Sequence, residues 1–162
     1  MIIKNSKILA SIIITTIGFS SCSQESPDAR LKRLSDELSE NSGNGNLSKM
    51  KELLSQGAEI NGKCCGVWPP INAAIENDQT EAVTFLINNG ADVNTDAKEG
   101  SPLLRAIYKK NFAVVKLLLE KGAKPNFKSS IDSVTAISEA EEQGDKEILE
   151  LLKKYSERKG TQ

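Results

Sequence analysis

The sequence contains no histidine and few aromatic residues, and these two scarcities narrow the functions open to it. Of its 162 residues 4% are aromatic and none is histidine. Histidine is the commonest general base and a frequent metal ligand, so its absence removes most ordinary catalytic constellations. With 38% apolar residues, the composition fits one domain with a small core and appendages rather than two domains.

The chain also lacks the charge and the motifs that several functional classes need. Its formal net charge is -1 at pH 7, so we expect no basic face for nucleic acid. It contains no glycine-rich phosphate loop and no nucleophile elbow. Neighbouring acids such as Glu141 and Glu142 are interpreted as a solvated helix face. We therefore expect a protein without enzymatic activity, cofactor, metal or small-molecule substrate.

Two of the three cysteines, Cys64 and Cys65, are adjacent and lie just before Trp68. In an oxidising compartment, neighbouring cysteines can form a strained and labile disulfide, so a redox role for this pair is one interpretation. The other is a pair of loop thiols with no role of their own. A zinc site is not expected, because zinc takes four nitrogen or sulfur ligands and the loop offers only these two.

The first 22 residues differ in composition from everything after them. Lys4 and Lys7 precede an apolar run from Ile8 to Phe19, which is followed by two serines and Cys22. The run is too short to span a bilayer, which needs roughly 20 apolar residues. A charged start, a short apolar run and small residues predict a secretory signal peptide over residues 1–21. A buried N-terminal helix is the alternative.

The segment Phe-Ser-Ser-Cys that ends at Cys22 resembles the lipobox of bacterial lipoproteins, although Phe19 stands where that family usually has leucine. The resemblance implies that Cys22 is acylated, as by palmitate, and becomes the mature N-terminus. It also implies a lipid-anchored protein of the bacterial cell envelope that faces the periplasm or the cell surface. Residues 22–29 would form a lipidated tether. Plain secretion after cleavage near Ser21 is the alternative and would leave Cys22 as a free thiol.

The pattern Gly-Ala-x-x-Asn occurs three times, starting at Gly57, Gly90 and Gly122. The copies are separated by 33 and then 32 residues, and the apolar runs before them keep the same spacing. This period is typical of a solenoid of stacked helix pairs. One such pair cannot bury its own apolar face, so several must stack.

Local chemistry predicts the helix boundaries of the central unit. Ser101 can accept a hydrogen bond from a free amide at a helix start, and Pro102 suits the first helical position. Apolar residues recur at helical spacing from Ala113 to Glu120, which predicts a second, half-buried helix. Gly122 can supply the left-handed residue that ends it.

The segments Ser101–Ala106 (SPLLRA) and Gly90–Asn94 (GADVN) resemble the T-P-L-x-x-A and G-A-D-x-N landmarks of the ankyrin repeat. The resemblance implies an all-α ankyrin solenoid of about four helix-turn-helix repeats joined by hairpin-like finger loops. The repeat domain would cover residues 30–156 and be followed by a flexible tail, 157–162. The repeats are placed at about residues 30–61, 62–94, 95–126 and 127–156.

The two outer repeats depart most from the family pattern. Asp36 and Glu37 stand at the T-P position of the first, and Ser156 stands at the terminal glycine position of the last. Such polar outer repeats suit the ends of a stack, where one face meets water. The family's histidine after T-P-L is missing, and the positions hold Asn72, Leu104 and Ser138.

The resemblance also implies a binding face. In ankyrin proteins the residue before T-P and the two residues after the A-A pair of the first helix face a concave groove. Here these positions are Trp68, Glu76, Asn77, Gly100, Tyr108, Lys109, Val134, Glu142 and Gln143. The only Trp and one of the two Tyr fall on this set, and aromatic residues are enriched at binding hot spots. Alternatively, Trp68 packs under its own finger and Tyr108 covers the adjacent repeat.

The function implied is a membrane-tethered, monomeric module that binds a protein partner through the groove and finger loops. Two other hypotheses stay open at this point. One is a redox-active envelope protein that uses Cys64 and Cys65. The other is a secreted effector that binds a host protein.

Overall fold

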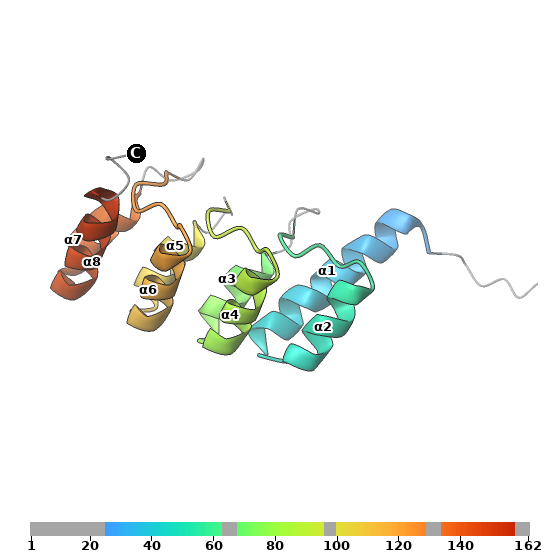
Figure 1. Cartoon of the computed structure of the whole chain (residues 1–162). Helices are drawn as coiled ribbons and strands as arrows, with labels where there is room; N and C mark the ends of the chain where they lie inside the picture. The colour runs from blue at the N-terminus through green and yellow to red at the C-terminus, as the bar shows by residue number, and fades with distance from the viewer. Residues whose placement is uncertain (1–24, 63–67, 96–99, 129–133, 158–162) are drawn as a thin grey trace, which may run out of the picture.

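The structure, a computed structural model, describes residues 25–62, 68–95, 100–128 and 134–157. These residues form eight helices and no strand, which confirms the predicted all-α solenoid. Figure 1 shows the helices as four pairs side by side in one row, with the first helices in contact with one another along it. The helices are α1 (Pro27–Gly43), α2 (Leu47–Ser55), α3 (Pro70–Glu76), α4 (Thr80–Asn88), α5 (Pro102–Tyr108), α6 (Phe112–Glu120), α7 (Ala136–Gln143) and α8 (Lys146–Glu157).

The helix boundaries of the third pair are those that local chemistry predicts. Ser101 Oγ accepts a hydrogen bond from the Leu104 amide at 3.3 Å, and Pro102 is the first residue of α5. The second helix, α6, begins one residue earlier than expected, at Phe112. It ends just before Gly122, whose φ of 95° is in the left-handed region that favours glycine. Each copy of Gly-Ala-x-x-Asn therefore begins at the residue that stops a helix.

The last helix lacks this stop signal. Ser156 stands where the other repeats have glycine, and α8 continues through it to Glu157. This gives α8 12 residues, against 9 in each of α2, α4 and α6. Glu157, the first residue of the expected tail at 157–162, is helical, and residues 158–162 lie outside the described part.

The first helix begins before the expected start of the repeat domain. It begins at Pro27, inside the expected tether, where Ser26 Oγ accepts a hydrogen bond from the Ala29 amide at 3.2 Å. It continues without a break to Gly43. The reason is the absence of any proline between Pro27 and Gly43 that would start a new helix at the T-P position.

A left-handed residue also makes the tight turn inside the two central pairs, and there it is not glycine. Asp78, between α3 and α4, has a φ of 55°, and Lys110, between α5 and α6, has a φ of 52°. This backbone costs an L-residue roughly 1 to 2 kcal/mol. The backbone strain is offset because this turn lets the two helices of a pair pack against each other. Asp78 Oδ1 also accepts a hydrogen bond from Asn111 of the next turn, at 3.2 Å.

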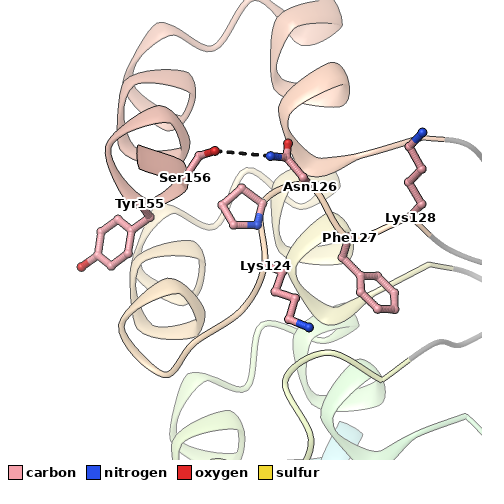
Figure 2. Close-up of a pocket in the computed structure, with 7 residues that line it drawn as sticks. Lys124, Asn126, Phe127, Lys128, Tyr155 and Ser156 are labelled. Atoms are coloured by element: carbon pink, nitrogen blue, oxygen red, sulfur yellow. Dashed lines mark hydrogen bonds between the residues drawn. The ribbon is translucent and has the colours of Figure 1, made fainter. Parts of the chain in front are cut away.

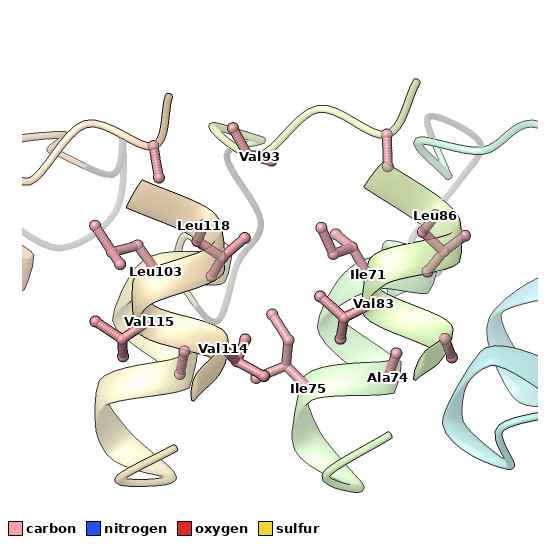
Figure 3. Close-up of a cluster of buried hydrophobic side chains, with 14 of the residues drawn as sticks. Ile71, Ala74, Ile75, Val83, Leu86, Val93, Leu103, Val114, Val115 and Leu118 are labelled. Carbon is pink, nitrogen blue, oxygen red and sulfur yellow. The ribbon is translucent and has the colours of Figure 1, made fainter. Parts of the chain in front are cut away.

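Apolar side chains between successive pairs form one core along the whole row. Figure 3 shows this core between the second and third pairs, where Val114 and Leu118 lie on the side of α6 that faces Ile71 and Ile75 of α3. The same cluster includes Leu38 of α1 at one end and Leu152 of α8 at the other. Each pair therefore covers the apolar face of the next.

Hydrogen bonds from the asparagine of Gly-Ala-x-x-Asn join each loop to the following one. Asn61 Oδ1 accepts from the Asp92 amide at 2.8 Å, and Asn94 Oδ1 accepts from the Lys124 amide at 2.9 Å. Asn94 Nδ2 also donates to the Gly122 carbonyl at 3.3 Å. These hydrogen bonds are exposed or part-buried, and each joins a side chain in one loop to a backbone group in the next, which fixes the register of the two loops. This role explains why asparagine ends the pattern.

Asn72 makes a similar link at the position of the family's missing histidine. Its side chain is 1% exposed, and its Nδ2 donates to the Gly100 carbonyl in the next repeat at 3.3 Å. The side-chain amide of Asn72 thus supplies one hydrogen bond between repeats at the position where the family has a histidine.

Leu118→Ala should destabilise the protein by about 2 to 5 kcal/mol, because Leu118 is fully buried in the core between the second and third pairs. Lys116→Ala, on the exposed side of α6, is the control and should have little effect. Urea denaturation followed by circular dichroism measures both. An unchanged curve for Leu118→Ala would contradict the packing of this stripe.

Asn94→Ala should cost about 0.5 to 1.5 kcal/mol, since it removes the hydrogen bonds that the Asn94 side chain makes with the Lys124 amide and the Gly122 carbonyl. Asn88→Ala removes an exposed asparagine at the end of α4 and should be nearly neutral. Thermal melts of the two variants in parallel test the claim. Equal melting temperatures would show that the asparagine link does not contribute to stacking.

Candidate functional site

Three of the predicted groove residues, Trp68, Glu76 and Lys109, are brought together around Arg105. The Arg105 guanidinium carbon lies 4.7 Å from the centroid of the Trp68 ring. Arg105 Nη1 donates to Glu76 Oε2 at 3.0 Å, and Lys109 Nζ lies 3.7 Å from Glu76 Oε1. We call these four residues the Arg105 cluster. It joins repeats two and three.

The helices position the cluster in a simple way. Arg105 and Lys109 are four residues apart at the end of α5, so they lie on the same face of that helix. Glu76 is the last residue of α3, and α3 packs against α5. Trp68 comes just before α3, where its carbonyl accepts a hydrogen bond from Ser39 Oγ of α1 at 2.8 Å. Residues from three consecutive repeats therefore hold the indole and the guanidinium in place.

Two interactions fix the Arg105 side chain. A planar guanidinium stacks well on an aromatic face, and the same group donates to a carboxylate. The Arg105 side chain is only 15% exposed, so the ion pair with Glu76 is less screened by salt than a surface pair. With two cations and one carboxylate, the cluster carries one net positive charge.

Tyr108 lies next to the cluster at the end of α5. Its side chain is 47% exposed, and it is the one large hydrophobic side chain that is exposed among the described residues. Nearly half of its surface is therefore open to solvent. Trp68 is half-buried, which agrees with its packing against Arg105.

The other two predicted residues of repeats two and three differ in exposure. Asn77 is exposed, and its Nδ2 donates to the Ala73 carbonyl at 3.2 Å. Gly100 is buried and has a φ of 93°. A Cβ atom at this position would meet Leu104 Cδ2 at 2.8 Å. Gly100 thus allows the loop to pack on α5 and presents no side chain to a partner.

The predicted residues of repeat four form a separate group on and before α7. Val134 is half-buried and Glu142 is exposed. Gln143 is half-buried and its Nε2 donates to Glu139 Oε1 at 2.6 Å. The buried Glu139 carboxylate therefore has an amide donor on its own helix.

The predicted lipid anchor and the possible redox role concern cysteines in other parts of the chain. Cys22, Cys64 and Cys65 lie outside the described residues, as do the signal peptide and the first residues of the tether. Over the residues that the structure places, no group of three or more His, Cys, Asp or Glu side chains could hold a metal ion. Within the same residues, none of the helices combines the length and the apolar character needed to cross a bilayer.

The shifted pKa values belong to residues at the start of α1. Hydrogen bonds from Arg33 to both carboxylate oxygens of Glu25, at 3.1 and 3.2 Å, lower the pKa of Glu25. Hydrogen bonds to Glu25 and then to Glu37 raise the pKa of Arg33 above its usual value. These groups are exposed, so solvent screens the pairs and their contribution to stability is small.

Arg105 is the functional residue that position-by-position reasoning missed. It occupies a variable position of the T-P-L-x-x-A landmark, so the repeat pattern gives it no role. The feature that could have identified Arg105 is its charge. Glu76 in one repeat pairs with two cations, four residues apart, in the next repeat.

Comparison with known proteins gives the family. Residues 38–129 match the sequence model of the family described as Ankyrin repeats (3 copies). The chain is 32% identical over 140 residues to a Caenorhabditis elegans protein, "Ankyrin repeat and KH domain-containing protein mask-1", covering 67% of this chain and 5% of that protein. It is 29% identical over 116 residues to the human "Transient receptor potential cation channel subfamily A member 1", covering 70% and 10% of the two chains.

A third relative is bacterial. It is a "Putative ankyrin repeat protein" of Rickettsia felis, 28% identical over 111 residues, covering 52% of this chain and 41% of that protein. The chain spans less than half the length of each of these relatives. The shared part is the repeat array, and proteins built from such repeats are in general binding modules without enzymatic activity. The family match covers more than half of the chain, and the protein belongs to the ankyrin-repeat family of protein-interaction modules.

Proposed function

We propose that this protein is a membrane-anchored interaction module of a bacterial cell envelope, which binds a protein partner through Tyr108 and the Arg105 cluster. The observation that carries the proposal is the exposed Tyr108 beside a Trp-Arg-Glu arrangement that is already held in place. Trp, Tyr and Arg are the residue types most enriched at binding hot spots.

The geometry favours binding because the groups are organised before a partner arrives. Ordering a long side chain at an interface costs roughly 0.5 to 1.5 kcal/mol. Arg105 is already fixed by Trp68 and Glu76, so most of that cost is absent. The net positive charge of the cluster favours a partner surface that offers a carboxylate or a carbonyl group near Lys109.

The N-terminal sequence supports an envelope location. A cysteine that carries two or more acyl chains gives stable attachment, whereas a single chain binds only weakly. Pro27, the first residue of α1, comes five residues after Cys22, a stretch that spans at most about 18 Å when extended. A lipid on Cys22 would therefore hold the first repeat close to the bilayer surface. The similarity to a Rickettsia felis protein agrees with a bacterial setting.

Tyr108→Ala should weaken partner binding by about 2 kcal/mol or more while leaving the melting temperature unchanged, because Tyr108 is an exposed side chain beside a fixed cluster. The partner is first captured from the source cell on the immobilised chain, and its dissociation constants for wild type and variant are then measured by titration. Glu120→Ala, an exposed change on α6, is the control and should bind normally.

Trp68→Ala should also weaken binding, but it will lower the melting temperature as well, since Trp68 is half-buried and stacked on Arg105. Comparison of the two variants distinguishes a residue that contacts the partner from a residue that holds the binding face in place. If Tyr108→Ala binds as tightly as wild type, this face is not the interface and the proposal fails.

Cys22→Ser should release the protein from membranes, because the serine hydroxyl cannot carry the thioether-linked lipid that the lipobox resemblance implies. Membrane fractionation and incorporation of a labelled fatty acid measure the effect. Cys64→Ser is the matched control and should keep both the label and the membrane fraction. Membrane association of the Cys22→Ser protein, with no label in the parent, would overturn the anchor.

A further inference from the structure

The C-terminal end of the row carries a pocket that the groove does not include. Its volume is about 390 Å³, and it lies between the last described loop, residues 124–128, and the end of α8 at Tyr155 and Ser156. Pro125 and Phe127 supply apolar surface, and Lys124 and Lys128 supply positive charge. Figure 2 shows Tyr155 and Phe127 on opposite sides of Asn126.

In the earlier repeats, the loop of the following repeat covers the corresponding asparagine. The amide of Asp92 donates to Asn61, and the amide of Lys124 donates to Asn94. Within the first repeat, Ser35 Oγ of α1 accepts a similar hydrogen bond from the Glu59 amide at 3.2 Å. Each of these amides follows a buried alanine. In each case, the side-chain acceptor is thus covered by a stretch of main chain in which a small buried residue is followed by an amide donor.

Asn126 is the next member of this series and lacks that partner. Its side chain is exposed, and its Nδ2 donates to Ser156 Oγ at 3.3 Å. No amide among the described residues donates to its Oδ1. The cause is the extension of α8 through Ser156 and Glu157, where the preceding repeats have turned into a loop at Gly-Ala. Among residues 25–62, 68–95, 100–128 and 134–157, no segment therefore covers this acceptor and this apolar pocket as the loops of the earlier repeats do.

The charged residues that line the pocket, Lys124 and Lys128, are both positive. Residues 121–128 and 151–156 contain five lysines and no aspartate or glutamate, whereas the whole chain has a net charge of -1. The lysines are exposed, and Lys153 lies 4.0 Å from Glu141 of α7. Glu120, Glu150 and Glu157 flank these stretches without lining the pocket. A negatively charged ligand is therefore favoured here.

We propose that this pocket binds an extended acidic segment of a partner protein. The segment donates a main-chain amide to Asn126 Oδ1 and places a small or apolar side chain against Phe127 and Tyr155. Its carboxylates pair with Lys124 and Lys128. This contact is separate from the Arg105 cluster and does not depend on it.

The probe is a fluorescent peptide that copies residues 90–96, Gly-Ala-Asp-Val-Asn-Thr-Asp, titrated with the full chain and followed by anisotropy. It carries the amide donor of the Asp92 junction and two carboxylates. Saturable binding that weakens at higher salt is expected. Asn126→Ala should weaken it about fivefold to tenfold through loss of one hydrogen bond. Lys124→Glu with Lys128→Glu should weaken it at least about tenfold.

Matched controls separate this site from the groove and from general charge. Lys51→Glu reverses an exposed charge on α2 and should leave peptide binding unchanged. Tyr108→Ala should also leave it unchanged, even where it abolishes binding of the groove partner. A peptide with both aspartates replaced by lysine should not bind. Circular dichroism melts of the Asn126→Ala and double lysine variants check that they are folded.

Four outcomes would overturn the proposal. One is the absence of saturable peptide binding, or binding that neither Asn126→Ala nor the lysine reversal alters. A second is much tighter peptide binding by a variant that ends at Glu157, since residues 158–162 would then be the natural occupant. A third is self-association in light scattering that the lysine reversal abolishes. The fourth is binding to anionic phosphatidylglycerol vesicles, lost in the same variant, without peptide binding.

Discussion

Burial of one apolar face between neighbouring helix pairs is the interaction on which the rest of this structure depends. A single pair has too little apolar area to fold alone, so Val114 and Leu118 are stabilised only because the adjacent pairs cover them. The proposed binding face has the same dependence. Glu76 and Arg105 belong to different repeats, and their ion pair exists only while those repeats are stacked. Stability and recognition are therefore coupled through the same junction.

The features that the sequence predicted well are local. A serine and a proline at a helix start, a glycine after a helix and an apolar stripe at helical spacing each act within a few residues, which is why the boundaries of α5 and the burial of α6 could be predicted. The bounds of α1 and α8 were harder. Both helices are long because a stop signal is absent, as at Ser156, and a degenerate repeat gives no positive pattern from which to place its ends.

The candidate site was predictable in outline and not in its contacts. The repeat period placed Glu76, Lys109 and Tyr108 at the ends of first helices, where the structure finds them. It did not show that Arg105 connects Trp68 to Glu76, because that contact spans 29 residues and depends on side-chain conformations. Gly100 was included by position alone, and its burial follows from the close approach of Leu104. Contacts between repeats depend on three-dimensional packing, and the repeat period of a sequence does not predict them.

The place of Trp68 makes the chain its own optical reporter. Trp68 is the only tryptophan, it is half-buried, and a guanidinium from the following repeat lies 4.7 Å from its ring centroid. Indole emission responds both to nearby charge and to solvent. Intrinsic fluorescence at one wavelength therefore follows the junction between repeats two and three specifically, without any attached dye. A change in emission that precedes the loss of helical circular dichroism would mark separation of these repeats before the helices themselves unfold.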